Sequence, residues 1–331
     1  MIHSAGADSE RKIVAILKVL SESSEPMGSI TIAKKLEQQG IYLSERAVRY
    51  HLKISDERGY TQPLGRDGRL ISEKGLEELS IALAPDRLTF IQEKLELLAF
   101  RTTFSPEKEE GLLPINTSLF DKEDYPKVLK IIKPVFKAGL CVSELVAVAQ
   151  GGEKLGDVVI PDNKVGLATV CGVVVNGVLL KHGIPMESRF GGILEIKNNS
   201  PSRFTAIINY GGTSLDPSEQ YMRARMTTVN EAVRDGTGRI LANFREIPAL
   251  SRSLVEEVIA MLKKSRINGV YYLGRISEPV CQIAVGINRC GVILVGGLNP
   301  VAAAVESGFN VENIAESGMI EFKELTSIWQ L

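Results

Sequence analysis

The segment SERAVRYHLKISDERGY, residues 44–60, carries side chains that could bind a polyanion. Four of them follow the spacing i, i+3, i+4, i+7: Arg46, Arg49, Tyr50 and Lys53. In a helix, this spacing puts all four on one face. Cations beside an aromatic ring suit the phosphates and base edges of duplex DNA. A solvated basic stripe on any surface helix gives the same pattern, so the neighbouring elements have to decide between the two.

Two glycine-rich loops could bind a small anion: YGGTSLDP at 210–217 and GGLNP at 296–300. Each runs into an acid or amide followed by proline. We therefore predict that Asp216 and Asn299 cap helices that begin at the next residue. Glycines let a ligand approach the backbone, and unpaired N–H groups at a helix start attract anions. For GGLNP, a simple capped turn between strand and helix explains the residues better.

The first loop has further groups that suit an anion. The hydroxyls of Thr213 and Ser214 are potential hydrogen-bond donors, and Asp216 would orient the loop by capping. The stretch HGIPMESRFGG offers His182 and Arg189 as cationic partners for a carboxylate. These five residues are the predicted anion site, with a plain capped turn as the equally open alternative.

Catalytic chemistry has little support in the sequence. The chain has only three histidines, and packing beside Leu52 accounts for His51. His182, Cys171 and Asp216 can be drawn as a nucleophile set, but no spacing fixes their geometry. The four cysteines form no C-x-x-C pair, and none has a zinc-ligand spacing to a histidine. We therefore predict no enzyme, no metal site and no cofactor.

The composition bounds the class of protein. A chain of 331 residues with 44% hydrophobic content can form two or three domains. Its 39 basic and 40 acidic residues nearly cancel, so any DNA contact must come from local charge. The cysteine pattern is typical of reduced thiols, and no apolar run reaches the length of a signal peptide or membrane span. We expect a cytoplasmic protein with no membrane partner.

The elements around the basic stripe favour DNA. They are helices over 9–20, 29–40 and 44–59, a hairpin over 60–71, and a helix from Ser72. Ser9 and Ser44 are the predicted caps of the first and third helices. This order is typical of a mostly α winged helix-turn-helix domain, here over residues 1–84. Such a fold lays its third helix in the major groove, and that helix carries the stripe.

The hairpin carries Arg66 and Arg69 at its tip, where a wing meets the phosphate backbone. The complete predicted DNA-binding set is Ser44, Arg46, Arg49, Tyr50, Lys53, Arg66 and Arg69. Winged helices also serve as protein-interaction modules, and that alternative stays open.

Residues 85–110 predict a helical connector. PDRLTFIQEKLELLAF has the pattern of an amphipathic helix that begins at Pro85 and Asp86. The connector could make a dimer contact. A helix packed on its own domain explains the pattern equally well.

Residues 111–331 mix strands and helices, which predicts an α/β domain. Strands are predicted at LLPINTSLF, IPMESRFGGILEI, SRFTAIINY, YYLGRI, VCQIAVGI and CGVILVGG. Helices are predicted at YPKVLKIIKPVFKAGL and from about Pro217, Ser251 and Pro300. Two apolar runs flank Asn176-Gly177, which favours a type I′ hairpin. The sheet should be mixed or antiparallel, and no G-x-G-x-x-G opens a helix as in a Rossmann domain.

Several motifs resemble the NrpR family of nitrogen-regulation repressors: ERAVRYHLK, DERG, NGVLLKHGIP, FGG, GTSLDP, NFREIPA and GGLNPVAA. They extend from about Glu10 to about Gly318. The resemblance implies a winged helix joined to an effector domain of α/β type, of which this chain has one where some members have two. It also implies a homodimer that represses nitrogen-assimilation genes and leaves operator DNA when 2-oxoglutarate signals nitrogen shortage. A related second regulator is a further partner that it leaves open.

Residues and resemblance together predict a DNA-binding repressor with a dicarboxylate sensor. The alternative is an enzyme or metabolite-binding protein that uses its winged helix as a protein-interaction module.

Overall fold

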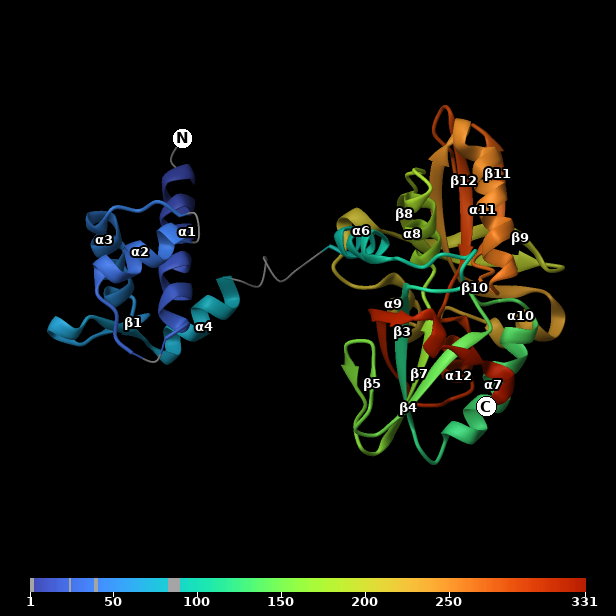
Figure 1. The fold of residues 1–331 in the computed structure, drawn as a ribbon, viewed down its shortest axis with the longest axis horizontal. Helices are drawn as coiled ribbons and strands as arrows, with labels where there is room; N and C mark the ends of the chain where they lie inside the picture. Colours follow the sequence, from blue (N-terminus) through green and yellow to red (C-terminus); the bar gives the residue numbers. More distant parts are fainter. Residues whose placement is uncertain (1–2, 24, 39–40, 83–89) are drawn as a thin grey trace. The chain divides into compact units, whose positions relative to one another are not determined.

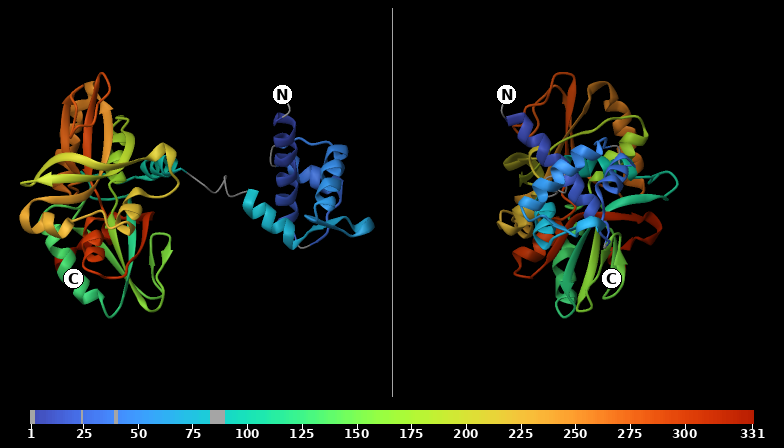
Figure 2. Two further views of the ribbon diagram at one scale, coloured as in Figure 1. Left: turned by 180° about the vertical axis from the view of Figure 1, so that it is seen from behind. Right: turned by 90° about the vertical axis from the view of Figure 1, so that its left-hand side faces the viewer.

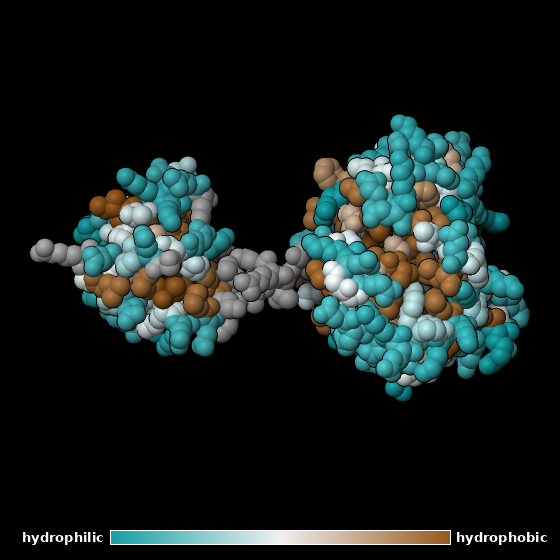
Figure 3. Space-filling model, turned by 60° about the horizontal axis from the view of Figure 1, so that its bottom comes forward, coloured by the Kyte–Doolittle hydropathy of each residue, from teal (hydrophilic) through white to brown (hydrophobic). Residues whose placement is uncertain are grey.

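The computed structural model describes residues 3–331 except 24, 39–40 and 83–89, and it divides into two compact units. Unit 1 is Met1–Thr89 and unit 2 is Phe90–Leu331 (Figure 1). On the face drawn in Figure 3, hydrophobic residues of unit 2 gather toward the centre and hydrophilic residues surround them. No helix among the described residues is both long and apolar enough to cross a membrane.

Unit 1 is a winged helix, as predicted. Its elements are α1 His3–Ser21, α2 Ser29–Gln38, α3 Glu45–Glu57, β1 Thr61–Pro63, the 3-10 turn η1 Gly65–Asp67, β2 Arg69–Ile71 and α4 Glu73–Ala82. The helices enclose a small apolar core that includes Ile16, Ile32, Leu36, Val48 and Leu52. Strands β1 and β2 pair antiparallel as the wing.

One glycine in the turn of the wing permits a close approach to the chain before α2. Gly68 has a φ of +109°, and a Cβ there would lie 2.4 Å from the carbonyl of Met27. Arg69 and Met27 exchange backbone hydrogen bonds of 3.1 and 3.0 Å, so the wing is joined to the chain before α2. The wing is therefore held by backbone contacts beside its turn.

The predicted caps of unit 1 have different outcomes. Ser44 caps α3, because its hydroxyl accepts a hydrogen bond from the Ala47 N–H at 3.3 Å. Ser9 is not a cap, and that prediction was wrong: α1 begins earlier, at His3, and Ser9 lies inside it. The Ser9 hydroxyl lies 3.4 Å from Nδ1 of the buried His51.

Unit 2 contains two five-stranded sheets in which every described pairing is antiparallel. The first, in spatial order, is β13 Glu312–Glu321, β3 Leu112–Asp121, β7 Lys164–Val170, β4 Leu145–Gln150 and β14 Thr326–Ser327. The second is β11 Val270–Ile276, β12 Arg289–Val295, β10 Gly238–Pro248, β8 Glu187–Lys197 and β9 Ser200–Asn209. A small hairpin, β5 Lys154–Leu155 with β6 Val158–Val159, extends from the first sheet. The predicted α/β domain with antiparallel sheet is confirmed.

Helices complete unit 2: α6 Ile91–Arg101, α7 Tyr125–Lys137, α8 Val173–Lys181, α9 Pro217–Arg223, α10 Val229–Asp235, α11 Arg252–Lys264 and α12 Asn299–Glu306. In Figure 1, α8 and α11 accompany the second sheet, and α7 and α12 lie beside the first; Figure 2 shows the same arrangement from behind. Strand β10 contributes to two cores, because Phe244 packs in one and Ile247 in the other.

The hairpin predicted at Asn176-Gly177 was wrong, because this segment is helix α8. All residues from Val173 to Leu179 are buried, and Asn176 is the one polar side chain among them, so the segment shows no helical periodicity. Gly177 has a packing role: a Cβ there would lie 2.4 Å from the Thr102 side chain. The glycine thus permits close contact with the chain after α6 and makes no turn.

The strand predicted at VCQIAVGI was also wrong. Cys281 and Gln282 have φ angles of 50° and 68°, which a strand excludes. The segment is a loop between β11 and β12 with one isolated bridge, Val280 to Ile283.

The predicted connector differs from the structure as well. Pro85 and Asp86 lie outside the described residues, and α6 begins at Ile91. Leu95 and Leu98 of α6 are buried with residues of unit 2 such as Tyr210. Helix α6 therefore belongs to unit 2, which agrees with the alternative of a helix packed on its own domain.

Candidate functional site

Helix α3 presents the predicted basic stripe to solvent. Val48 and Leu52 are fully buried, whereas the Tyr50 side chain on the opposite face is 64% exposed. Arg46 and Lys53 are exposed on this same face. The amphipathic pattern thus gives one face to the core of unit 1 and leaves the other for a partner.

Weak ion pairs accompany the stripe. Arg49 pairs with Glu45, one turn earlier, and its Nε donates to the Ser29 hydroxyl at 3.4 Å. Lys53 Nζ lies 4.0 Å from a carboxylate oxygen of Glu57. Exposed pairs of this kind contribute about 0–1 kcal/mol, so they can give way to phosphates or bases.

The two wing arginines have different positions. Arg66 lies in the turn between β1 and β2. The Arg69 guanidinium is held by Asp56 of α3, with Nε 3.0 and 2.9 Å from the two carboxylate oxygens and Nη2 2.9 Å from one of them. Thr61 also donates to Asp56. Arg69 thus joins the wing to α3, and its guanidinium is not free for the predicted phosphate contact.

The structure does not bring the five predicted anion-binding residues together. The Thr213 hydroxyl donates to the Leu215 carbonyl and accepts from the Leu215 N–H, both at 3.0 Å. Ser214 is half-buried. His182 lies at the end of α8, where Nδ1 is 2.9 Å from the Val178 carbonyl and Nε2 is 3.7 Å from Glu107.

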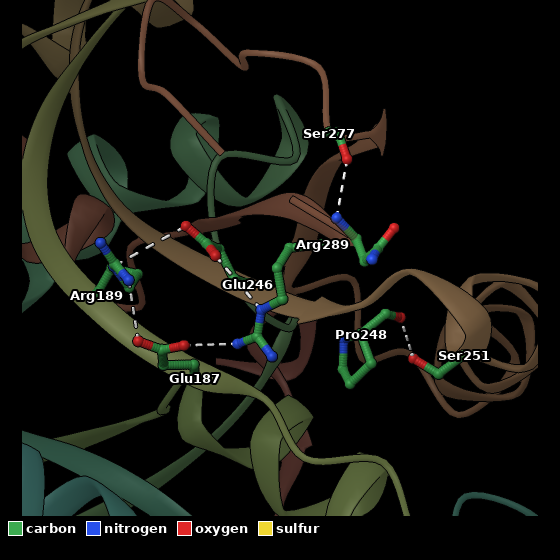
Figure 4. Close-up of polar contacts among 8 residues, drawn as sticks. Glu187, Arg189, Glu246, Pro248, Ser251, Ser277 and Arg289 are labelled. Carbon is green, nitrogen blue, oxygen red and sulfur yellow. Dashed lines mark hydrogen bonds and ion pairs between the residues drawn. The ribbon is translucent and has the colours of Figure 1, made fainter. Parts of the chain in front are cut away.

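Arg189 belongs to a separate charge cluster on β8, β10 and β12 (Figure 4). Its guanidinium lies 3.0 Å from Glu187 and 3.9 Å from Glu246. Arg289 lies 2.6 Å from Glu187 and 3.4 Å from Glu246, which is 3% exposed. Two cations and two carboxylates neutralise one another here. The cluster therefore explains Arg189 without a ligand.

Asp216 is the predicted residue that does reach a cavity. Its carboxylate caps α9 by accepting from the Glu219 N–H at 2.9 Å, as predicted. Asn299 does not cap α12, so that prediction was wrong. Its side-chain amide instead bonds the N–H and carbonyl of Leu241 at 2.8 and 3.0 Å. Asn299 thereby fixes the second loop against β10.

The two loops meet at a narrow cleft of about 20 Å³, room for about one water. Its polar lining is Asn116, Cys171, Tyr210, Asp216, Ser218, Asn243, Arg245 and Glu316, with Gly297 from the second loop. His182 and Arg189 are not part of this lining. The lining comes from β3, β10 and β13 as well as from the loops, so segments far apart in sequence converge here.

Arg245 is the unusual member of this cleft. Its side chain is 1% exposed, and Nε and Nη1 have no hydrogen-bond partner in the described part of the chain. The guanidinium lies 4.8 Å from the centre of the Tyr210 ring, whose hydroxyl donates to Asn243. An arginine buried with unmet donors is costly unless an anion completes it. The cleft therefore has the chemistry of an anion site.

The carboxyl groups of the cleft have raised pKa values. Burial, with the nearby Glu316 carboxylate, raises the pKa of Asp216 well above its ordinary value. Burial also raises the pKa of Glu316, although Lys94 opposes that shift. Lys94 Nζ is 3.5 Å from Glu316 and donates to the Ala315 carbonyl at 2.9 Å. Protonated carboxyls would reduce repulsion of an incoming anion.

The nucleophile set drawn from the sequence does not form at this cleft. Burial raises the pKa of the Cys171 thiol to about 12, so at neutral pH the thiol stays protonated. His182 does not line the cleft, so the set of His182, Cys171 and Asp216 does not form. Among the described residues, no group of three or more acidic, histidine or cysteine side chains could hold a metal ion.

Sequence reasoning missed Arg245, Tyr210, Asn243 and Glu316 as site residues. The available signal was the motif NFREIPA, which places an arginine and a glutamate inside a central strand. Side chains alternate along a strand, so Arg245 and Glu246 point to opposite faces of the second sheet. Arg245 enters the cleft, and Glu246 joins the cluster of Arg189.

Comparisons with known proteins agree on one family. A family model described as NrpR regulatory domains NRD1 and 2 matches residues 88–327, and one for the ribonuclease R winged-helix domain matches 14–79. The global nitrogen regulator NrpRI of Methanosarcina mazei is 38% identical over 319 residues, covering 96% of this chain and 98% of that protein.

Two longer relatives are the global nitrogen regulators NrpR of Methanococcus maripaludis and Methanocaldococcus jannaschii, 34% and 33% identical over 95% and 96% of this chain. The chain spans about half of their length, 54% and 55%. A solved structure of a nitrogen repressor-like protein from Methanococcus jannaschii has a TM-score of 0.61 and 27% identity, covering 72% of this chain and 99% of that one.

Proposed function

This chain belongs to the NrpR family of nitrogen regulators, and from that premise we propose that it is a 2-oxoglutarate-controlled repressor of nitrogen-assimilation genes. As a homodimer, it binds operator DNA through two winged helices, one for each half-site. 2-Oxoglutarate enters the cleft at Arg245 and causes release of the DNA. The single observation that supports a sensor site is the buried guanidinium of Arg245, in which two nitrogens have no hydrogen-bond partner among the described residues.

The chemistry of the cleft fits a small dicarboxylate. One carboxylate would bind the Arg245 guanidinium, whose planar donors match two oxygens at once. Tyr210, Asn116 and Asn243 supply further polar groups for the second carboxylate and the ketone. The pKa values of Asp216 and Glu316 are raised, so these carboxyl groups take up a proton more readily than free ones, and a protonated carboxyl would donate to the ligand.

The small size of the cleft suggests how ligand binding could change the conformation of unit 2. About 20 Å³ is too small for 2-oxoglutarate, so the ligand must bind an arrangement in which the cleft has opened. A ligand that binds one arrangement better shifts the population toward it. In this proposal, the closed arrangement binds DNA and the open one does not.

Helix α6 is the proposed link from the cleft to unit 1. It is the first helix of unit 2, and it contacts both walls of the cleft. The Ile91 N–H donates to the Thr213 carbonyl at 2.9 Å, and Lys94 contacts Ala315 and Glu316. A ligand that separates these walls would have to break one of these contacts and move α6.

Unit 1 supplies the DNA contacts in this proposal. Arg46, Arg49, Tyr50 and Lys53 would contact the major groove, and the backbone at the Ser44 cap would contact a phosphate. Arg66 would contact a second phosphate from the wing. Arg69 is omitted, because its guanidinium is held by Asp56.

Calorimetric titration of the full chain with 2-oxoglutarate tests the sensor. We expect Arg245→Met to lose affinity by roughly hundredfold or more, as when one partner of a buried charge pair is removed. Arg239→Ala is the matched control, because Arg239 is an exposed arginine on the same strand. Arg189→Gln should also bind like the parent. If Arg189→Gln loses affinity and Arg245→Met keeps it, the dicarboxylate binds at the cluster of Figure 4.

A further inference from the structure

A second, larger groove lies between α9, α12 and β13 and is distinct from the Arg245 cleft. It holds about 590 Å³, which is within the range of small-molecule sites. Its buried floor includes Leu119, Met222 and Val301, and Val305 and Phe309 line it further. The groove therefore has an apolar floor that no step of the proposed function uses.

Two cations stand at this groove. Arg223, at the end of α9, and Arg225 both line it and are exposed, and neither forms an ion pair within the described ranges. Arg225 has a φ of 53°, a backbone conformation that residues other than glycine rarely adopt. This places two free guanidinium groups beside an apolar floor.

The carboxylates that line the groove already have partners. Glu219 accepts from the Ala315 N–H at 2.8 Å, and Glu312 lies 3.1 Å from Lys164. They do not neutralise the two arginines. The guanidinium donors of the two arginines are therefore left for a ligand.

We propose that this groove is a second ligand site, which binds a small molecule with an apolar body and one carboxylate. The apolar floor would take the body, and Arg223 and Arg225 would take the carboxylate. 2-Oxoglutarate itself does not match this groove, because it has no apolar body to cover the floor.

The two sites share structural elements. Helix α9 begins after Asp216, which lines the cleft, and ends at Arg223, which lines the groove. Strand β13 carries Glu316 in the cleft and Asn313 in the groove. A ligand in the groove should therefore change the affinity of the cleft for 2-oxoglutarate, and the reverse effect must be equal. This coupling rests on the proposed function, whereas binding in the groove does not.

The test uses octanoate as the probe on the full chain. Its binding is measured as displacement of the fluorescent anion 8-anilinonaphthalene-1-sulfonate. We expect one saturable site that binds octanoate at least tenfold more tightly than octanol. Arg223→Ala with Arg225→Ala should remove that preference and leave octanol binding unchanged. Arg239→Ala, an exposed arginine outside the groove, should behave like the parent.

A second variant keeps the test independent of the arginines. Val305→Trp places a large ring in the groove from a half-buried position on α12 and should abolish both octanoate and octanol binding. Arg245→Met should lose 2-oxoglutarate and keep octanoate, which separates this proposal from the first. Octanoate binding that survives both the arginine pair and Val305→Trp, in variants that melt like the parent, would overturn the proposed site.

Discussion

Arg49 and Arg245 show two ways in which a protein prepares an arginine for an anion. The Arg49 side chain is 68% exposed on α3 and has Glu45 beside it, so water and a weak pair already satisfy it. Arg245 is 1% exposed in unit 2, and two of its nitrogens have no partner among the described residues. At a site of the first kind, affinity for the anion is the sum of many small contacts. At a site of the second kind, affinity depends on one buried group. Replacing Arg245 should therefore change the stability of the chain, whereas replacing Arg49 should not.

The largest contrast is expected for Arg245→Met. The buried charge costs stability while the cleft is empty, and methionine keeps an apolar contact with the Tyr210 ring. We expect the variant to be more stable than the parent, because the unmet donors of a buried guanidinium are removed. Chemical denaturation without ligand measures this difference. A variant less stable than the parent would mean that Arg245 stabilises the fold and is not kept for a ligand.

Arg49→Ala should leave stability unchanged and weaken DNA binding. An exposed arginine contributes little to the fold, but a bidentate contact with guanine is worth about 1–3 kcal/mol. The measurement is fluorescence anisotropy at physiological salt with a duplex selected from random sequences by the parent chain. Lys74→Ala, an exposed cation on α4, is the control. Equal affinity of Arg49→Ala and parent would remove α3 from the interface.

Arg69→Ala should behave differently from Arg66→Ala, although both residues are in the wing. Loss of the half-buried Asp56 pair should cost about 1–2 kcal/mol of stability. Arg66→Ala should keep stability and reduce the salt slope of DNA binding by about one ion. Denaturation combined with anisotropy at several salt concentrations separates the two. An unchanged stability for Arg69→Ala would return Arg69 to the phosphate-binding set.

Asp216→Asn should flatten the dependence of stability on pH. The pKa of Asp216 is raised in the folded state, so the folded chain holds this proton when the unfolded chain has lost it. Stability contributed by the protonated group is therefore full below the unfolded pKa and declines as pH rises toward the folded one. Asparagine can still cap α9, so the helix is kept. Parallel pH curves for variant and parent would contradict the buried, proton-holding carboxyl.

The sequence predicted the structure correctly where a residue pattern is compatible with one kind of element only. The period of α3 fixed which side chains face outward, and Ser44 marked its start because few residues serve as caps. Asn176-Gly177 misled because two apolar runs around Asn-Gly fit a hairpin and a fully buried helix equally. Arg245 was not predicted as a site residue, because an arginine suggests an anion site of this kind only when it is buried without partners. Its distance from Tyr210 and its lack of partners follow from the meeting of β10 with two distant loops, which no local pattern contains.

DNA release by the Arg245→Met variant tests the central claim most directly. Anisotropy of the selected duplex is followed while 2-oxoglutarate is added to the parent and to the variant, at fixed salt. We predict that the parent releases DNA, whereas the variant binds the duplex as tightly as the ligand-free parent and keeps it at every 2-oxoglutarate concentration. Release of DNA from the variant at the same 2-oxoglutarate concentration as from the parent would contradict the account.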